Sequence, residues 1–181
     1  PEDVQNTYGG RGGDNILGRP IGSFYGYVAD GIFKTQDEVN NHVGQDGKAI
    51  GRIRYKNVYE EDGRNEINAM DQTWIGNPYP DFSYGLNINL EYRNFDLSMF
   101  FQGVQGADIV NVVKYQTDFW SVDDVNSNKG RRLLDAFHPV TNPDSDIPML
   151  QNTNSNNEGR FSTYYVEDGS YLKVRNVQFG Y

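Results

Sequence analysis

The feature that most constrains the fold is an unbroken alternation of side chains over residues 82–92. Six large apolar or aromatic residues occupy every second position, and five small, amide or acidic residues lie between them. This period of two is that of a β-strand with one apolar and one polar face. A strand of a soluble protein averages about five or six residues, whereas one that crosses a membrane needs roughly nine to eleven. The length therefore favours a strand of a membrane barrel.

A second strand is predicted over residues 95–103, after a tight turn at Arg93-Asn94. Its apolar residues again recur at every second position, and Phe100 breaks the alternation by pointing to the polar side. We therefore predict a transmembrane β-hairpin over residues 81–103. The residues predicted to face lipid are Phe82, Tyr84, Leu86, Ile88, Leu90 and Tyr92. The alternative is a long hairpin of a soluble β-sandwich that packs one face on a core.

The last segment, residues 164–181, is also strand-like. Its apolar positions run through Leu172 and Val174 and then resume at Val177, so one residue has been inserted into the alternation. This pattern predicts a β-bulge near Arg175-Asn176, which re-aims the strand so that its second half also presents its apolar side to lipid.

Composition and charge exclude several classes of protein. No run approaches the roughly 18 apolar residues of a membrane helix, so a membrane crossing here requires strands. The formal net charge of −9 argues against a nucleic-acid partner, because phosphates require a basic face. The absence of cysteine excludes disulfides and thiolate metal sites.

The remaining residues are predicted to form loops. Residues 1–80 are rich in Gly, Asn and charged residues, which predicts a loop lobe with short strands and one helix. That helix should follow the capping box Thr35-Gln36-Asp37-Glu38 and run to about His42. Residues 104–163 lack a sustained period and read as one long loop. Because barrels combine short periplasmic turns with long extracellular loops, both regions are expected outside the cell.

An enzyme is not expected. His42 and His138 are far apart and lack metal-ligand spacing, so each reads as an ordinary surface histidine. Carboxylate pairs such as Glu60-Glu61 are accompanied by no nucleophile elbow or zinc motif and read as solvated charge.

Aromatic residues in the predicted loops are candidates for contact with a ligand or a partner. Exposed aromatic side chains often mark binding surfaces and can stack on sugar rings. The candidates are Trp74, Tyr115, Phe119 and Trp120. The alternative for the three residues of the long loop is a small core beneath it.

Several blocks of the sequence, taken in order, resemble SusC/RagA-type TonB-dependent outer-membrane receptors. The blocks are residues 20–27, 30–33, 75–85, 95–98 with 102–106, and 166–177 with 180–181. The resemblance implies an all-β fold, namely a segment of a large antiparallel transmembrane β-barrel with long extracellular loops and a short loop helix. The whole barrel would have about 22 strands and a plugged lumen.

The resemblance also implies a function in nutrient import. Such receptors work under a SusD-like surface lipoprotein, take up oligosaccharides or peptides, and are driven through their plug by TonB. The chain begins at Pro1 with neither an initiator Met nor a leader, so we expect a segment of a longer chain. The resemblance implies that this segment is a late part of the barrel, without the plug and the final strands. The alternative function is that of a soluble all-β module that binds carbohydrate or protein.

One loop departs from the family's pattern. The family usually has an acidic loop whose alternating oxygen donors suit a hard cation such as calcium. The corresponding stretch here, residues 57–71, keeps oxygen donors at Asp62, Asn68 and Asp71, but extra residues and Arg64 disturb the spacing. These residues are the candidate calcium ligands. A solvated acidic turn at Asp62-Gly63 is the preferred interpretation.

Overall fold

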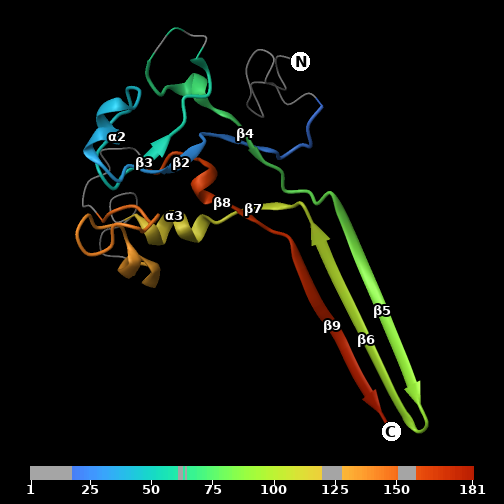
Figure 1. The fold of residues 1–181 in the computed structure, drawn as a ribbon. Helices are drawn as coiled ribbons and strands as arrows, with labels where there is room; N and C mark the ends of the chain where they lie inside the picture. The colour runs from blue at the N-terminus through green and yellow to red at the C-terminus, as the bar shows by residue number, and fades with distance from the viewer. Residues whose placement is uncertain (1–17, 61–62, 64, 120–127, 151–157) are drawn as a thin grey trace. The chain divides into compact units, whose positions relative to one another are not determined.

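The computed structural model describes residues 18–60, 63, 65–119, 128–150 and 158–181. Their regular secondary structure consists mainly of strands, with a few short helices (Figure 1). The chain divides into two compact units. Unit 1 contains Pro1–Gly76 and Val110–Val166, and unit 2 contains Asn77–Ile109 and Glu167–Tyr181. Among the described residues, we find no helix with the length and apolar character needed to span a bilayer.

Most elements are short, and three strands are long. The strands are β1 (Phe24–Gly26), β2 (Ala29–Ile32), β3 (Ile53–Tyr55), β4 (Thr73–Gly76), β5 (Phe82–Tyr92), β6 (Phe95–Gln105), β7 (Asp108–Val110), β8 (Val166–Asp168) and β9 (Tyr171–Gly180). The helices are α2 (Gln36–Asn41) and α3 (Val112–Asp118), with 3-10 turns η2 (Ala69–Asp71), η3 (Arg131–Asp135) and η4 (Thr163–Tyr165).

Unit 2 is built around an antiparallel sheet in the order β5-β6-β9. The predicted hairpin is confirmed, with β5 over Phe82–Tyr92 and the turn at Arg93-Asn94. Strand β6 continues to Gln105, two residues past its predicted end, because Val104 and Gln105 still pair with the first residues of β5. Figure 1 shows the three strands side by side, with the C-terminus beside the turn.

The predicted bulge in the last strand is confirmed. Phe100 of β6 lies opposite Asn176 of β9, whereas the next residue, Phe101, lies opposite Val174. Arg175 is therefore the extra residue of β9. Because side chains alternate between faces, the bulge keeps the apolar residues before and after it on one side of the sheet.

Two glycines of this sheet make room for aromatic rings on opposite faces. A Cβ atom at Gly85 would lie 3.2 Å from Cε2 of Phe100, and one at Gly103 would collide with the ring of Tyr84. An aromatic ring that covers a strand glycine restores packing that the glycine lacks. The predicted inward turn of Phe100 thus has a structural counterpart in Gly85.

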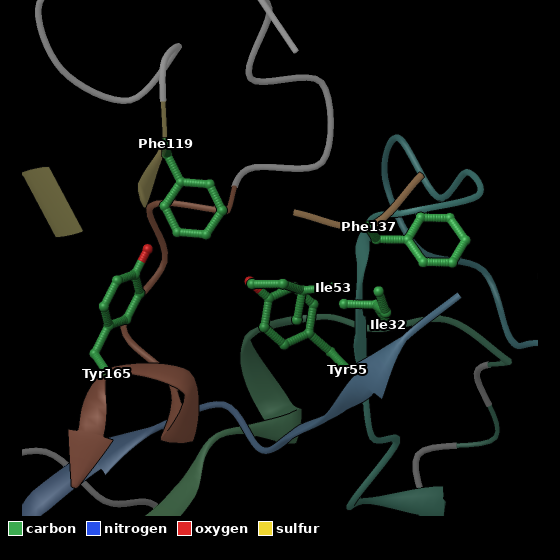
Figure 2. Packing of buried hydrophobic residues seen from close by; sticks show 6 residues of the cluster. All are labelled: Ile32, Ile53, Tyr55, Phe119, Phe137 and Tyr165. Carbon is green, nitrogen blue, oxygen red and sulfur yellow. The ribbon is translucent and has the colours of Figure 1, made fainter. Parts of the chain in front are cut away.

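Unit 1 contains the two-stranded sheets β1-β4 and β2-β3, and its chain comes from two stretches separated by the hairpin. The region predicted as one long loop contributes α3 and η3 to this unit, so part of it has regular structure. The buried core joins residues from separate segments (Figure 2). Its members are Ile32, Ile53, Tyr55, Phe119, Phe137 and Tyr165.

The predicted helix of the first lobe is present as α2, and half of its capping box is confirmed. The Thr35 hydroxyl accepts a hydrogen bond from the Glu38 N–H at 3.2 Å. The Glu38 carboxylate, however, accepts from the Lys34 N–H at 2.7 Å, one residue before the position that the box predicts. The helix ends at Asn41, and the next residue, His42, is its C-cap.

Candidate functional site

One face of the three-stranded sheet is apolar over most of its length, with Gln105 opposite Phe82 as the polar exception at one end. Its side chains align in cross-strand rows, because residues directly opposite in an antiparallel pair share a face. The rows are Leu90–Leu97–Phe179, Ile88–Met99–Val177, Leu86–Phe101–Val174 and Tyr84–Gly103–Leu172. We call this surface the apolar sheet face. Leu86 of the outer strand β5 is 54% exposed, and Val177 of the outer strand β9 is 59% exposed. Within the described residues, nothing packs over these two side chains enough to bury them.

Aromatic rings gather at both ends of the apolar sheet face. Near the turn, the Phe95 ring lies 5.7 Å from that of Phe179 and 5.1 Å from that of Tyr181. At the other end, the rings of Phe82 and Tyr84 are 5.9 Å apart. Girdles of aromatic residues at the two membrane interfaces are typical of transmembrane barrels.

The opposite face of the sheet carries mainly amides, hydroxyls and charges. The Ser98 hydroxyl donates to Oδ1 of Asn89 at 2.8 Å. Phe100, Val104 and Tyr171 are exceptions. Phe100 lies in one row with Asn87 of β5 and Asn176 of β9, and Val104 lies between Ser83 and Tyr171. We call this surface the polar sheet face. The two faces together give each strand one side suited to lipid and one suited to water.

The predicted aromatic candidates have different surroundings. Trp74 of β4 is half-buried and meets Tyr25 edge to face, with ring centres 5.0 Å apart. The guanidinium of Arg19 lies 5.1 Å from the Trp74 ring centre. Trp74 therefore lies in a local aromatic and cationic cluster of unit 1. Trp120 lies outside the described residues, as does the side chain of Tyr115.

Phe119 is a core residue. It is 4% exposed, and its ring lies 5.5 Å from that of Tyr164 and 6.1 Å from that of Tyr165. For this residue, the expectation of ligand contact is therefore wrong, and the alternative of a small core beneath the loop is correct. The sequence could not decide between them, because Tyr164 and Tyr165 follow Phe119 by more than forty positions.

The acidic loop is organised by hydrogen bonds. Asn68 and Asp71 cap each other's backbone amides around η2, and Asp71 is 1% exposed. One oxygen of Asp71 accepts from the Asn68 N–H at 2.8 Å, and the other accepts from the N–H groups of Val58 and Tyr59. Both oxygens of Asp71 are thus engaged by donors. Asp62 lies outside the described residues, and no cluster of three metal-ligating side chains occurs in the described part of the chain.

The two histidines have separate roles. His42, expected at the surface, is half-buried, with its ring 5.1 Å from that of Phe33, and burial lowers its pKa. Nδ1 of His138 accepts from the N–H groups of Val140 and Thr141 and shapes a turn. His42 therefore packs against an aromatic ring, whereas His138 stabilises a turn through its side chain.

A buried ion pair in unit 1 was not foreseen from the sequence. The guanidinium of Arg52, 1% exposed, lies 2.9 Å from a carboxylate oxygen of Glu158, which is fully buried. Arg52 also donates to the Met149 carbonyl, and the second oxygen of Glu158 accepts from the Ile53 N–H. The Tyr165 hydroxyl donates to the Glu158 carbonyl at 2.7 Å. Burial lowers the pKa of Arg52, which still remains far above neutrality because guanidinium does not lose its proton in proteins.

Two further contacts surround this pair. The Arg160 guanidinium lies 5.0 Å from the ring centre of Tyr27 and 4.9 Å from that of Tyr55, close enough for cation–π attraction. The Tyr164 hydroxyl donates to buried Asp118 at 2.9 Å. Burial raises the pKa of Tyr55 and of Tyr164. The Arg160 contacts join residues 158–165 to the first lobe, and the Tyr164 contact joins them to α3.

Comparison of the sequence with known proteins identifies the family of the chain. No family model matches the chain. A curated relative from Formosa agariphila, "TonB-dependent receptor P3", is 33% identical over 166 residues, which cover 91% of this chain. The "TonB-dependent receptor P26" of the same organism is 30% identical over 92% of this chain. The chain is a segment of a TonB-dependent receptor. It spans 15% and 16% of the length of these two relatives.

The TonB-dependent receptor segment has the predicted fold class. Its regular secondary structure is mainly strands with a few short helices, as expected for part of a β-barrel. A third relative, "TonB-dependent receptor P39" from Formosa agariphila, is 28% identical over 91% of this chain. The alignments of these relatives cover nearly the whole chain, so the likeness extends beyond the strands of the hairpin.

Proposed function

We propose that this segment forms part of the wall and surface loops of an outer-membrane TonB-dependent transporter that imports glycans or peptides. The single observation that carries the proposal is the apolar sheet face. Its rows run across three strands without a charged side chain, and Leu86 and Leu90 of β5 and Leu172, Val174, Val177 and Phe179 of β9 are all more than half exposed. Burying an aliphatic or aromatic side chain is worth about 1.5–3 kcal/mol, so a face of this size needs an apolar environment.

Lipid supplies that environment on the outside of a barrel. The strands have the length of spanning strands, since β5 and β6 contain 11 residues each. The aromatic rings at the two ends of the apolar sheet face suit the two membrane interfaces. With this face toward lipid, the polar sheet face lines the lumen.

The loops are assigned by length. The turn at Arg93-Asn94 is the short connection expected on the periplasmic side, and residues 1–80 and 104–163 are the long connections expected outside the cell. On this assignment the core of unit 1, including the Arg52–Glu158 pair, stiffens an extracellular lobe. Trp74 is a proposed contact residue of that lobe for a ligand or partner.

The partners are proposed from the resemblance. The blocks at residues 75–85 and 166–177 look like those of SusC/RagA-type receptors, which implies a SusD-like lipoprotein as the extracellular partner. TonB would act through a plug carried elsewhere in the whole receptor. The names of the relatives support the TonB-dependent part of this proposal.

Site-directed labelling tests the orientation of the sheet. In the full receptor, single cysteines at Asn87 and Ile88 place a thiol on the polar and the apolar sheet face. A membrane-impermeant maleimide applied to purified receptor in nanodiscs should label the cysteine at 87 and leave that at 88 unreacted. In detergent-free unfolded receptor, both should react equally, which serves as the control. Equal labelling in nanodiscs would instead favour a soluble module.

A further inference from the structure

The chain that follows α2 is fastened to β3 by a buried side chain. Gln45 is 7% exposed, and its amide donates to the Ile53 carbonyl at 2.8 Å. Its carbonyl oxygen accepts from the Tyr55 N–H at 2.9 Å. The side chain thus takes the place of a neighbouring strand beside β3. We call residues 42–48, which Gln45 holds in this way, the latch segment.

His42 is the first residue of the latch segment, and its ring packs inward. The ring centre lies 5.1 Å from that of Phe33, which is fully buried. The ring is hydrogen-bonded to the Tyr55 backbone and to the Gln45 side chain. Nε2, by contrast, is buried and has no hydrogen-bond partner among the described residues. Only one side of the ring is therefore satisfied, which suits an uncharged imidazole.

The charged side chains near the ring do not compensate a positive charge on it. A surface hollow beside His42 is lined by the charged residues Asp30, Glu38, Arg54 and Lys56. The carboxylates of Asp30 and Glu38 lie 3.5 and 3.7 Å from the Arg54 guanidinium, which offsets their charge. The Lys48 ammonium donates to the His42 carbonyl at 2.7 Å and adds a positive charge from the latch segment itself. In the described part of the chain, no ion pair joins a carboxylate to the His42 ring.

Protonation of His42 conflicts with this environment. Both nitrogens of an imidazolium ring are N–H donors, so Nε2 becomes a buried donor without an acceptor. An unsatisfied buried donor and a charge close to like charges both cost free energy. Asn57 lines the same hollow, and its Oδ1 is also buried without a partner, but no hydrogen bond joins it to His42. The charged ring has to move to reach this or another acceptor.

We propose that His42 is an acid-sensitive latch, which holds α2 and the latch segment on β3 at neutral pH and releases them in acid. The inference goes beyond the proposed function and does not depend on the orientation of the three-stranded sheet, because every residue that carries it belongs to unit 1. On the proposed topology the lobe lies outside the cell, so the latch responds to the pH of the medium.

The pH range of release follows from the direction of the pKa shift. Burial is the main cause that lowers the pKa of His42 below its ordinary value of 6.5, and Lys48 and Arg54 lower it further. The hydrogen bonds to Tyr55 and Gln45 act in the opposite direction. In the released segment His42 has its ordinary pKa, so the released state binds the proton at a higher pH than the latched state. The latch is therefore fully held above about pH 6.5 and weakens below it, until the pH reaches the pKa of the latched ring.

Hydrogen exchange in the full receptor in nanodiscs tests the latch. The amides of α2 and the latch segment, and the Tyr55 N–H that Gln45 binds, should lose protection between about pH 7.5 and about pH 5.5. The loss should be at most about tenfold per pH unit, because a single proton is involved. Rates are corrected for the pH dependence of chemical exchange itself. The amides of β5 and β6 should keep their protection over this range, which distinguishes local release from general unfolding.

Three variants assign the effect. His42→Gln keeps a hydrogen-bonding side chain that does not titrate, and it should remove the pH dependence of α2 and the latch segment. The matched control is His138→Gln, because His138 is an exposed histidine of the same unit whose Nδ1 accepts from a turn. Its profile should equal that of the wild type. Lys48→Gln removes one repelling charge and should make the decline shallower, which keeps the test open if His42→Gln does not assemble.

Several results would overturn the latch. One is constant protection of α2 and the latch segment over the whole pH range. Another is a decline that persists unchanged in His42→Gln, which would assign the acid response to carboxylates such as Asp30 and Glu38. A decline in Lys48→Gln equal to that of the wild type would contradict the repulsion on which the latch depends. None of these results affects the maleimide labelling, which tests the proposed function separately.

Discussion

The side chains of Val174 and Val177 lie on the same face of β9, although an odd number of positions separates them. The bulge at Arg175 accounts for this, because Phe101 and Met99, two positions apart on β6, are their partners. The inserted residue, Arg175, has no partner on β6, and the pairing resumes directly on both sides of it. The rows of the apolar sheet face therefore continue past the bulge.

The first prediction follows from this bulge. Deleting Arg175 from the full receptor restores a regular alternation in which both valines keep their face, so the receptor should assemble at close to the wild-type level. Deleting Ser98 from the central strand β6 should abolish assembly, because it moves Met99 and Phe101 to the polar sheet face. The amount of heat-modifiable, folded receptor on cold SDS gels measures both. Equal loss in the two variants would mean that the bulge itself is required for closure.

The second prediction compares neighbouring positions on opposite faces. Leu86→Arg should destabilise the receptor by about 2–4 kcal/mol if Leu86 is near the bilayer midplane, because a charge on the lipid face is costly there. Asn87→Arg, one residue further and on the polar sheet face, should cost much less. Reversible unfolding of the full receptor in lipid vesicles gives both free energies. Similar costs would contradict the assignment of the two faces.

The third prediction concerns the buried ion pair. Glu158→Gln leaves the Arg52 guanidinium buried without a counter-charge, which should destabilise unit 1 by about 3–5 kcal/mol. Hydrogen exchange at the backbone amides of β3 in the full receptor reports this change. The matched control is the exposed pair between Lys34 and Asp146, 3.0 Å apart, where Asp146→Asn should cost at most about 1 kcal/mol. Unchanged protection of β3 in Glu158→Gln would be inconsistent with a structural role for the pair.

The fourth prediction is a loss of stability at alkaline pH. Burial raises the pKa of the Tyr55 and Tyr164 hydroxyls above the ordinary value of 10.0. The folded state therefore retains these protons where the unfolded state has lost them, so their contribution is complete below about pH 10 and declines as the pH rises further. Proteolysis of unit 1 in the full receptor should accelerate above that pH. Tyr55→Phe should reduce the pH dependence, and an identical profile would argue against this origin.

The sequence predicted those parts of the fold that depend on a local alternation of apolar and polar residues. The strands of the hairpin and the bulge near Arg175 follow from the alternation of apolar residues, because a strand places successive side chains on opposite faces. The packing of unit 1 could not be predicted in this way. Arg52 and Glu158 are 106 positions apart, and neither belongs to a periodic pattern.

The candidate site shows the same division. The membership of the apolar sheet face and the inward direction of Phe100 follow from the sequence, whereas the alignment of Phe100 with Asn176 depends on which strand pairs with β6. The core position of Phe119 likewise depends on two tyrosines in a distant segment. The cap at η2 does have a local signal, because Asn68 and Asp71 have the Asn-x-x-Asp spacing of a capping box.

The ion pair between Arg52 and Glu158 also makes unit 1 depend on chain that lies beyond the hairpin. Arg52 precedes the hairpin in the chain and Glu158 follows it, so both belong to a unit whose two stretches are interrupted by β5 and β6. During synthesis from the N-terminus, Arg52 is made before the hairpin and its counter-charge is made after it. A truncation between the hairpin and Glu158 therefore removes both β9 and the partner of Arg52.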